Sequence, residues 1–219
     1  GEVALREVPP LTLTLHRVIW AVPILVLIVL FKGISVPRSP RIWGAYLVMG
    51  ALNNAIPFSL LFWGQTQIES GLVSILNGTT AMFAAVVAGL LLPDEALTAK
   101  KVIGAGLGIA GVAFIMGPSA LTNFNLSNLA QLAILGATLS YAFAGVWGKT
   151  ALAGQLPLMN ALGMLIGSTV LMIPIVLVFD GRPNLALSLG VWGALIGMAV
   201  LSTALAYFLY FAILVRAGA

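Results

Sequence analysis

Two polar pairs interrupt long apolar stretches of this sequence at corresponding places. Asn53 and Asn54 lie within IWGAYLVMGALNNAIPFSLLF, and Ser202 and Thr203 lie within VWGALIGMAVLSTALAYFLYF. Burying such groups without hydrogen-bond partners costs roughly 2–7 kcal/mol each, so they should face protein or water. They could bind an uncharged or zwitterionic polar molecule, or they could bond neighbouring helices to one another.

Ionisable side chains are scarce in the apolar stretches. His16 and Arg17 are the only ones well inside such a stretch, and no Asp or Glu occurs between Glu95 and Asp180. Arg17 could reach back to the membrane surface, or it could anchor an anionic group because its guanidinium presents a planar fork of donors. The sequence offers no paired acids, His cluster or Ser-His set, so we expect no catalytic residue, no metal site and no cofactor.

The remaining candidates are polar or aromatic residues in other apolar stretches. Tyr207 follows Thr203 by one helical turn, as Phe58 follows Asn54, so each pair shares a helix face. Tyr141 lies deep in its own stretch, where a Tyr usually has a hydrogen-bond partner and can also face a cavity. The candidate substrate-binding residues are Asn53, Asn54, Asn77, Thr80, Tyr141, Ser202, Thr203 and Tyr207, with Arg17 as the candidate anion anchor.

Two further motifs indicate structure rather than chemistry. GAGLGIAG contains G-x-G-x-x-G, but it lies inside an apolar stretch and lacks the acidic residue that a dinucleotide site needs about 20 residues later. Gly104 and Gly108 also form G-x-x-x-G, which predicts close packing against another helix. In PDEALTAKK, we expect Glu95 to cap the next helix or to pair with Lys100.

The composition identifies the solvent in which these residues lie. Hydrophobic residues make up 61% of the 219 residues and charged residues 7%, against about 45–50% and 25% in an ordinary soluble domain. The excess of basic residues, a net charge of +4, is spread singly between apolar runs. We therefore expect an integral membrane protein that binds no nucleic acid.

Seven stretches are long and apolar enough to span a membrane as helices. They cover about 12–31, 43–65, 72–92, 101–117, 129–148, 158–179 and 190–214. The separators hold most of the Pro, Asn, Asp and charged residues, as loops should. Transmembrane β-strands, by contrast, are segments of about 10 residues with alternating polarity, so the sequence favours an all-α fold.

The second and seventh stretches are copies of one another. IWGAYLVMGAL begins at Ile42 and VWGALIGMAVL begins at Val191, 149 residues later (191 minus 42). The copies are five helices apart, and an odd number reverses direction through the bilayer, so the repeat is predicted to be inverted. We infer ten helices in two inverted five-helix repeats: 1–118 lacking its first helix, and 119–219 lacking its last two.

The Lys and Arg residues predict the orientation in the membrane. Most lie on one side, which the positive-inside rule assigns to the cytoplasm. That side holds Lys32, Arg38, Arg41, Lys100, Lys101, Lys149 and Arg216, whereas Arg6 and Arg182 lie on the other. We expect a multi-pass protein of the inner (plasma) membrane.

Three segments resemble the EamA-type branch of the drug/metabolite transporter superfamily: NNAIPFSLLFWGQTQIESGLVSILNGTTAMF, PDEALTAKKVIGAGLGIAGV and LSTALAYFLYFAILVRAGA. The resemblance covers nearly the whole chain. It implies ten helices as two inverted repeats, both termini in the cytoplasm, and export or exchange of small metabolites.

The residues and the resemblance together predict a transporter. It would be an exporter or exchanger that moves a small polar or zwitterionic metabolite by alternating access. A membrane-embedded enzyme and a receptor-like helical bundle are the alternatives. The expected partners are a small-molecule substrate and the lipid bilayer, and the sequence leaves the oligomeric state open.

Overall fold

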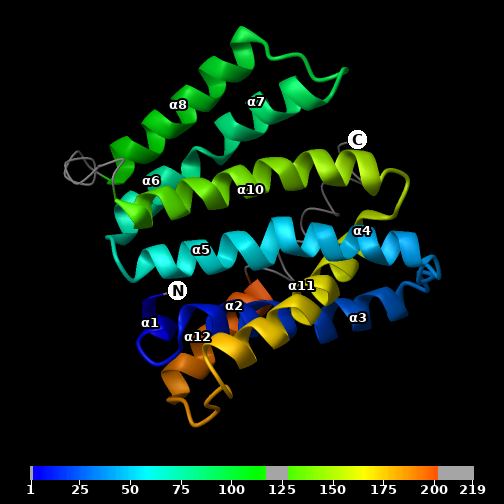
Figure 1. Ribbon diagram of the computed structural model, residues 1–219, viewed down its shortest axis with the longest axis vertical. Helices are drawn as coiled ribbons and strands as arrows, with labels where there is room; N and C mark the ends of the chain where they lie inside the picture. The colour runs from blue at the N-terminus through cyan, green and yellow to red at the C-terminus, as the bar shows by residue number, and fades with distance from the viewer. Residues whose placement is uncertain (1, 117–127, 202–219) are drawn as a thin grey trace. The chain divides into compact units, whose positions relative to one another are not determined.

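The computed structural model describes residues 2–116 and 128–201, and these ranges contain helices but no strand (Figure 1). Five helical segments of 22 to 26 residues are long and apolar enough to cross a membrane. They are Pro10–Phe31, Pro40–Gln65, Ser70–Leu91, Leu129–Ala151 and Pro157–Phe179. These segments confirm the all-α class and five of the seven predicted spans.

The other two predicted spans have not been tested as membrane crossings. The span predicted at 101–117 coincides with the 18-residue helix α8 (Ala99–Met116). The span predicted at 190–214 begins as the shorter apolar helix α12 (Leu189–Ala199), and its later part lies outside the described residues.

The chain packs as two compact units, each considered by itself. Unit 1 comprises residues 1–55 and 152–219, and unit 2 comprises residues 56–151. The described elements of unit 1 are α1 (Glu2–Leu5), α2 (Pro10–Ile19), α3 (Ala21–Phe31), α4 (Pro40–Gly50), the π-helix η1 (Ala51–Ala55), α11 (Pro157–Phe179) and α12 (Leu189–Ala199). Those of unit 2 are α5 (Ile56–Gln65), α6 (Ser70–Gly78), α7 (Thr80–Leu91), α8 (Ala99–Met116) and α10 (Leu129–Ala151). Each unit draws helices from both predicted repeats.

In unit 1, α11 packs against α4, α2, α3 and η1. Its Gly163 and Gly167 have the G-x-x-x-G spacing and let α4 approach closely. A Cβ added at Gly163 would overlap the fully buried ring of Tyr46 on α4, and one at Gly167 would lie 2.8 Å from the carbonyl oxygen of Tyr46. From the α4 side, a Cβ at Gly50 would lie 2.6 Å from the backbone nitrogen of Ser168.

The packing contact predicted at Gly104 and Gly108 is absent from the described residues. Both glycines are exposed, and a Cβ added at either would meet no atom within 4 Å. The prediction is therefore wrong for this part of the chain, because the G-x-x-x-G spacing gives a flat helix face but does not decide which helix covers it. The close contact is made by Gly163 and Gly167 instead.

In unit 2, α10 packs against α5, α6 and α7. Ile134 of α10 is fully buried and forms a cluster with Leu72, Val73 and Leu76 of α6. On α5, a Cβ added at Gly64 would lie 2.8 Å from Cγ1 of Ile134. Small and branched side chains thus hold α10 against its neighbours.

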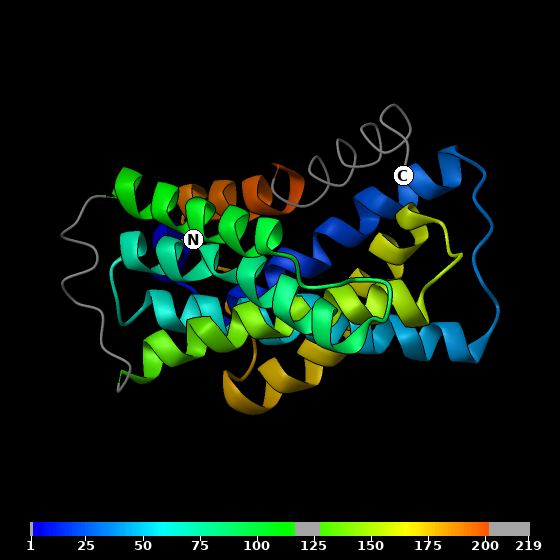
Figure 2. The same ribbon diagram turned by 90° about the horizontal axis from the view of Figure 1, so that it is seen from above.

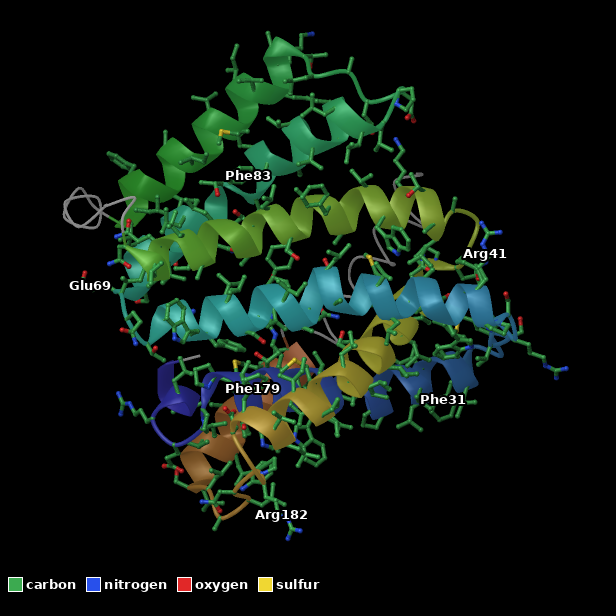
Figure 3. The ribbon with its side chains drawn as sticks, in the orientation of Figure 1. Phe31, Arg41, Glu69, Phe83, Phe179 and Arg182 are labelled. Atoms are coloured by element: carbon green, nitrogen blue, oxygen red, sulfur yellow. The ribbon has the colours of Figure 1, made fainter. Side chains whose placement is uncertain are left out.

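The outer surface of unit 1 is apolar along its helices. Phe31 at the end of α3, on the outer side of that helix in Figure 3, and Phe179 at the end of α11 are 88% and 75% exposed. Arg41 and Arg182 extend from opposite ends of the unit. Exposed apolar side chains between charged ends are what a lipid solvent requires.

Helices α4 and α12, both in unit 1, have bounds that match at the offset of the sequence repeat. Helix α4 covers 40–50 and α12 covers 189–199, so both bounds differ by 149 residues (189 minus 40, 199 minus 50). Each begins after a serine N-cap, Ser39 or Ser188. Each is followed by π-helical backbone, in η1 and at Val200 and Leu201. Figures 1 and 2 show the two helices running in roughly opposite directions.

Candidate functional site

Asn53 and Asn54 lie on η1, a single π-helical turn in the middle of the span Pro40–Gln65. Pro57 follows four residues after Asn53 and has no N–H to bond the Asn53 carbonyl, which loosens the helix at this point. The wider turn presents both asparagines differently from a regular helix, and π-turns within α-helices are frequent at functional sites. Asn54 is 2% exposed, and Asn53 is half-buried.

The side chain of Asn54 bonds to α11. Its Nδ2 donates to Oγ of Ser168 over 2.9 Å. Oγ of Ser168 lies 2.6 Å from the carbonyl oxygen of Met164 and 3.1 Å from that of Gly50, and its single proton can serve one of them at a time. Nδ2 of Asn53 lies 3.4 Å from the sulfur of Met164. These contacts tie η1 and α4 to α11 through polar groups.

Ser168 is a polar residue of this region that the sequence analysis missed. It is fully buried and lies at the centre of the 23-residue helix α11. A signal was available, because Ser168 falls at the midpoint of the predicted span 158–179, as Asn54 does in its own span. Ser168 lies outside the two repeat copies, so the repeat does not point to it.

In unit 2, the span Ser70–Leu91 is interrupted at Thr79, between α6 and α7. The hydroxyl of Thr79 bonds to the carbonyl oxygen of Leu76 over 2.6 Å and lies 3.3 Å from the hydroxyl of Thr138 on α10. The hydroxyl of Thr80 donates to the carbonyl oxygen of Asn77 over 2.6 Å. Side-chain hydroxyls thus bond carbonyl oxygens that the interrupted helix leaves free.

The candidate residues are divided between the two units. Arg17, Asn53 and Asn54 belong to unit 1, and Asn77, Thr80 and Tyr141 belong to unit 2. Among the unit 2 candidates the side chain of Asn77 is exposed, and those of Thr80 and Tyr141 are half-buried. The other candidates, Ser202, Thr203 and Tyr207, lie outside the described residues. The role of each candidate in binding a substrate stays a prediction.

The span Pro10–Phe31 is interrupted at Trp20, between α2 and α3. Trp20 donates its indole N–H to Nδ1 of His16 over 3.0 Å. His16 is 5% exposed, so protein atoms cover it, whereas the neighbouring Arg17 is half-buried. A further aromatic residue, Trp192 of α12, packs edge to face against both His16 and Trp20.

Ion pairs join the end of α10 to the loop that follows α7. Lys149 lies 2.9 Å from both Asp94 and Glu95, and Lys101 lies 2.6 Å from Glu95. Hydrogen bonds from Lys101 and then Lys149 lower the pKa of Glu95 to about 2. The predicted pairing with Lys100 is therefore wrong, since Lys101 makes this contact. Glu95, Lys101 and Lys149 also line a cavity of about 290 Å³ whose other walls are mostly alanines of α7 and α10.

In unit 1, acidic side chains cap the N-terminal ends of two helices. The carboxylate of Asp180 accepts hydrogen bonds from the backbone N–H and the hydroxyl of Thr12, in the first turn of α2. The carboxylate of Glu7 accepts from the backbone N–H of Ser188, and this bond lowers the pKa of Glu7. Both carboxylates complement the positive N-terminal end of a helix.

Three of the described spans share one feature, which is an interruption of the helix near the middle of the span. Trp20, η1 and Thr79 each lie within a few residues of the centre of their span. Irregular backbone at membrane depth is tolerated where protein or a water-filled cavity covers it, and interrupted helices of this kind form the binding sites of many transporters. The fold and its polar mid-span residues define a multi-pass membrane protein of the transporter class.

Comparison with known proteins identifies the family. The model of the EamA-like transporter family matches residues 1–117 and 128–219, so the chain belongs to this family. An uncharacterized transporter of Bacillus subtilis (strain 168), YoaV, is 26% identical over 216 residues, which cover 97% of this chain and 73% of YoaV. The family and its relatives indicate a membrane transporter rather than an enzyme.

Two more relatives are similar in sequence, and one solved structure shares the fold. Protein PecM of Dickeya dadantii (strain 3937) is 25% identical over 84% of this chain and 61% of its own length. A second uncharacterized transporter of B. subtilis (strain 168), YvbV, is 32% identical over 79% of this chain and 56% of its own length. A protein crystal structure with 18% identity aligns with a TM-score of 0.72 over 94% of this chain and 71% of that one, which shows a shared fold.

Proposed function

We propose that this transporter exports or exchanges a small polar or zwitterionic metabolite across the inner (plasma) membrane by alternating access. Its binding site would use Asn54 and the repeat-related Thr203, with the other candidate residues nearby. The observation that carries this proposal is the π-helical turn in the middle of a span. That turn places two neutral asparagine side chains inside unit 1, where a cargo with hydrogen-bonding groups could be bound.

An inverted repeat of two five-helix halves is supported by α4 and α12. Their bounds match at an offset of 149 residues, both lead into π-helical backbone, and they run in roughly opposite directions (Figures 1 and 2). The family model also matches two ranges, 1–117 and 128–219, close to the predicted repeats 1–118 and 119–219. Two inverted halves around a mid-membrane site are the usual basis of alternating access.

The predicted orientation is supported by the ends of unit 1. Arg41 and Arg182 lie at opposite ends of the unit (Figure 3), as the assignment of their loops to opposite sides of the membrane requires. Lys32 and Arg38 lie in the loop that precedes α4, on the same side as Arg41. The excess of Lys and Arg on that side supports a cytoplasmic location for it.

Transport by purified protein in liposomes, measured against a panel of labelled amino acids, sugars and nucleosides, tests the proposal. Asn54→Leu keeps the approximate size of the side chain and removes its hydrogen-bonding groups. We expect this variant to be folded in the membrane and to have lost transport of whichever labelled compound the wild type moves.

Ser168→Ala is the matched control, because it removes the partner of Asn54 and leaves the Asn54 amide in place. If Asn54 binds the cargo, Ser168→Ala retains most of the transport that Asn54→Leu loses. Equal losses in the two variants would mean that Asn54 acts through helix packing alone. Wild-type transport by Asn54→Leu would remove this residue from the binding site.

A further inference from the structure

His16 is the single histidine of the sequence and is buried in unit 1. Its ring lies nearly parallel to the indole of Trp20, with ring centroids 6.4 Å apart and planes 9° from parallel. Trp192 of α12 packs against it edge to face, at a centroid distance of 5.9 Å. Two indole rings therefore surround His16. Within the described helices of this unit, away from their ends, it is the one side chain that can change its charge near neutral pH.

The hydrogen bond between these residues fixes the protonation state of His16. An indole N–H can only donate, so Nδ1 of His16, which accepts the bond from Trp20, carries no proton. The proton of the neutral ring is then on Nε2, which is buried and has no hydrogen-bond partner. A second proton would have to bind Nδ1, and it would remove the acceptor that Trp20 uses.

The bond lies at the interruption of a membrane span. Trp20 is the residue between α2 and α3, and it bonds back to the preceding turn of α2 through His16. Its backbone, at φ −73° and ψ −18°, departs from regular α-helical values. Losing the bond would therefore release the side chain that ties this joint to α2.

A groove beside Trp20 has room for the indole once its bond to His16 is broken. The groove has a volume of about 360 Å³ and is lined by Ile19, Trp20, Val22, Pro23, Ile166, Thr169 and Val170. The wall is almost wholly apolar, because the hydroxyl of Thr169 donates to the carbonyl oxygen of Leu165 over 2.8 Å. The groove would therefore hold the indole ring by apolar contact.

The surroundings contain few other charges. Helices α3, α11 and α12 and the turn η1, which pack against α2, include no ionisable residue within their bounds. Helix α1, which also packs against α2, contains Glu2. The nearest charged groups along the chain are Arg17 on α2 and Arg6 and Glu7 before it, with Asp180 at the end of α11. Both carboxylates are engaged, Asp180 by Thr12 and Glu7 by Ser188.

We infer that His16 is a proton-binding site that couples proton binding to transport. Protonation at Nδ1 breaks the bond from Trp20, moves the indole into the groove and changes the joint between α2 and α3. Deprotonation restores the bond. The coupling rests on the proposed transport function, whereas the local switch does not depend on it.

The local switch is tested by nuclear magnetic resonance of the protein in lipid nanodiscs, with ¹⁵N-labelled histidine and tryptophan. His16→Gln and Trp20→Phe assign the two resonances. Between roughly pH 4 and pH 8 we expect the His16 nitrogens to titrate from the Nε2–H tautomer to the doubly protonated ring. The Trp20 indole resonance should shift with the same midpoint and should be independent of pH in His16→Gln.

Trp192→Phe is the matched control, because it keeps an aromatic ring against His16 and leaves the Trp20 bond in place; it should preserve the coupled titration. A His16 ring that stays neutral across this range, or one that titrates without moving the Trp20 resonance, overturns the switch. Trp20→Phe provides a second test if His16→Gln does not fold, because it removes the bond and retains the histidine.

The coupling is tested in liposomes with an imposed pH gradient. The gradient should accelerate wild-type transport of the labelled compound, and this acceleration should be lost in His16→Gln. Transport that the gradient does not change, together with an intact titration, overturns the coupling and leaves the transport function standing. If the wild type transports no compound in the panel, the proposed transport function and the coupling are both overturned. The titration of His16 and Trp20 then still tests the local switch.

Discussion

Replacing Gly163 by alanine should destabilise unit 1 strongly. The new Cβ would lie 2.6 Å from Cε2 of Tyr46 and nearer still to two other ring atoms. The ring is fully buried, so it has no free space into which to move. Overpacking of this kind costs about 1–3 kcal/mol, and the overlap with several ring atoms places Gly163→Ala at the upper end. Alanine favours the helix over glycine by up to about 1 kcal/mol. The net loss in the free energy of unfolding is therefore about 2 kcal/mol.

The midpoint of thermal unfolding in detergent measures this loss. A change of 1 kcal/mol corresponds to about 2–4 °C for a protein of this size, so Gly163→Ala should unfold about 4–8 °C below the wild type. Gly44→Ala is the control on α4, because its added Cβ meets no atom within 4 Å, and it should not lower the midpoint. Tyr46→Leu should remove most of the effect of Gly163→Ala, because the ring is what the methyl group meets. Equal midpoints for Gly163→Ala and Gly44→Ala would refute the packing of α4 against α11.

Three further predictions concern other parts of the chain. The pKa of Glu95 is lowered from 4.5 to about 2 in the folded protein. Its ion pairs therefore stabilise the fold fully above about pH 4.5, and this stabilisation is lost as the pH falls through about 2. Between these pH values the thermal unfolding midpoint of Glu95→Gln should depend less on pH than that of the wild type. Ser35→Cys should react with a membrane-impermeant thiol reagent only after the membrane is opened, whereas Ser119→Cys should react from outside, and labelling of position 35 in intact cells would reverse the orientation. In a double-mutant cycle on unfolding, Asn54→Ala and Ser168→Ala should show a coupling of about 0.6–1.7 kcal/mol, and additive effects would contradict their hydrogen bond.

The helical spans could be predicted from the sequence because the bilayer imposes a simple rule of length and hydropathy. The predicted span 43–65 begins three residues after the observed start at Pro40, and the predicted span 158–179 begins one residue after Pro157. The interruption at η1 has a sequence signal in Pro57, whose missing N–H leaves the Asn53 carbonyl without its helical partner. Pro23 likewise follows the interruption at Trp20 by three residues, but Pro174 lies inside α11 without ending it. A proline alone therefore does not predict an interruption, and hydropathy averages over the residues concerned.

Partners in space were the least predictable feature. Asn54 was selected for its mid-span position, but its partner Ser168 is 114 residues away and is brought to it by the packing of α11. Glu95 was expected to meet Lys100 and meets Lys101 instead, because one residue along a helix turns the side chain by about 100°. Patterns along the sequence indicate which faces are polar or flat, and tertiary packing decides what each face contacts.

The two copies of the repeat differ in sequence where their backbones agree. Both α4 and α12 lead into π-helical backbone at positions 149 residues apart, 51 and 200. Pro57 cannot be the common cause, because the corresponding residue of the second copy is Ala206. Both copies instead place a polar pair, Asn-Asn or Ser-Thr, two residues after the π-helical turn begins. In the copy whose polar pair the structure describes, the two amides bond to Ser168 and Met164 of α11, so we propose that a polar pair favours the irregular turn by bonding a neighbouring helix. We propose that the same mid-span pairs are the residues that meet a cargo at the centre of the membrane.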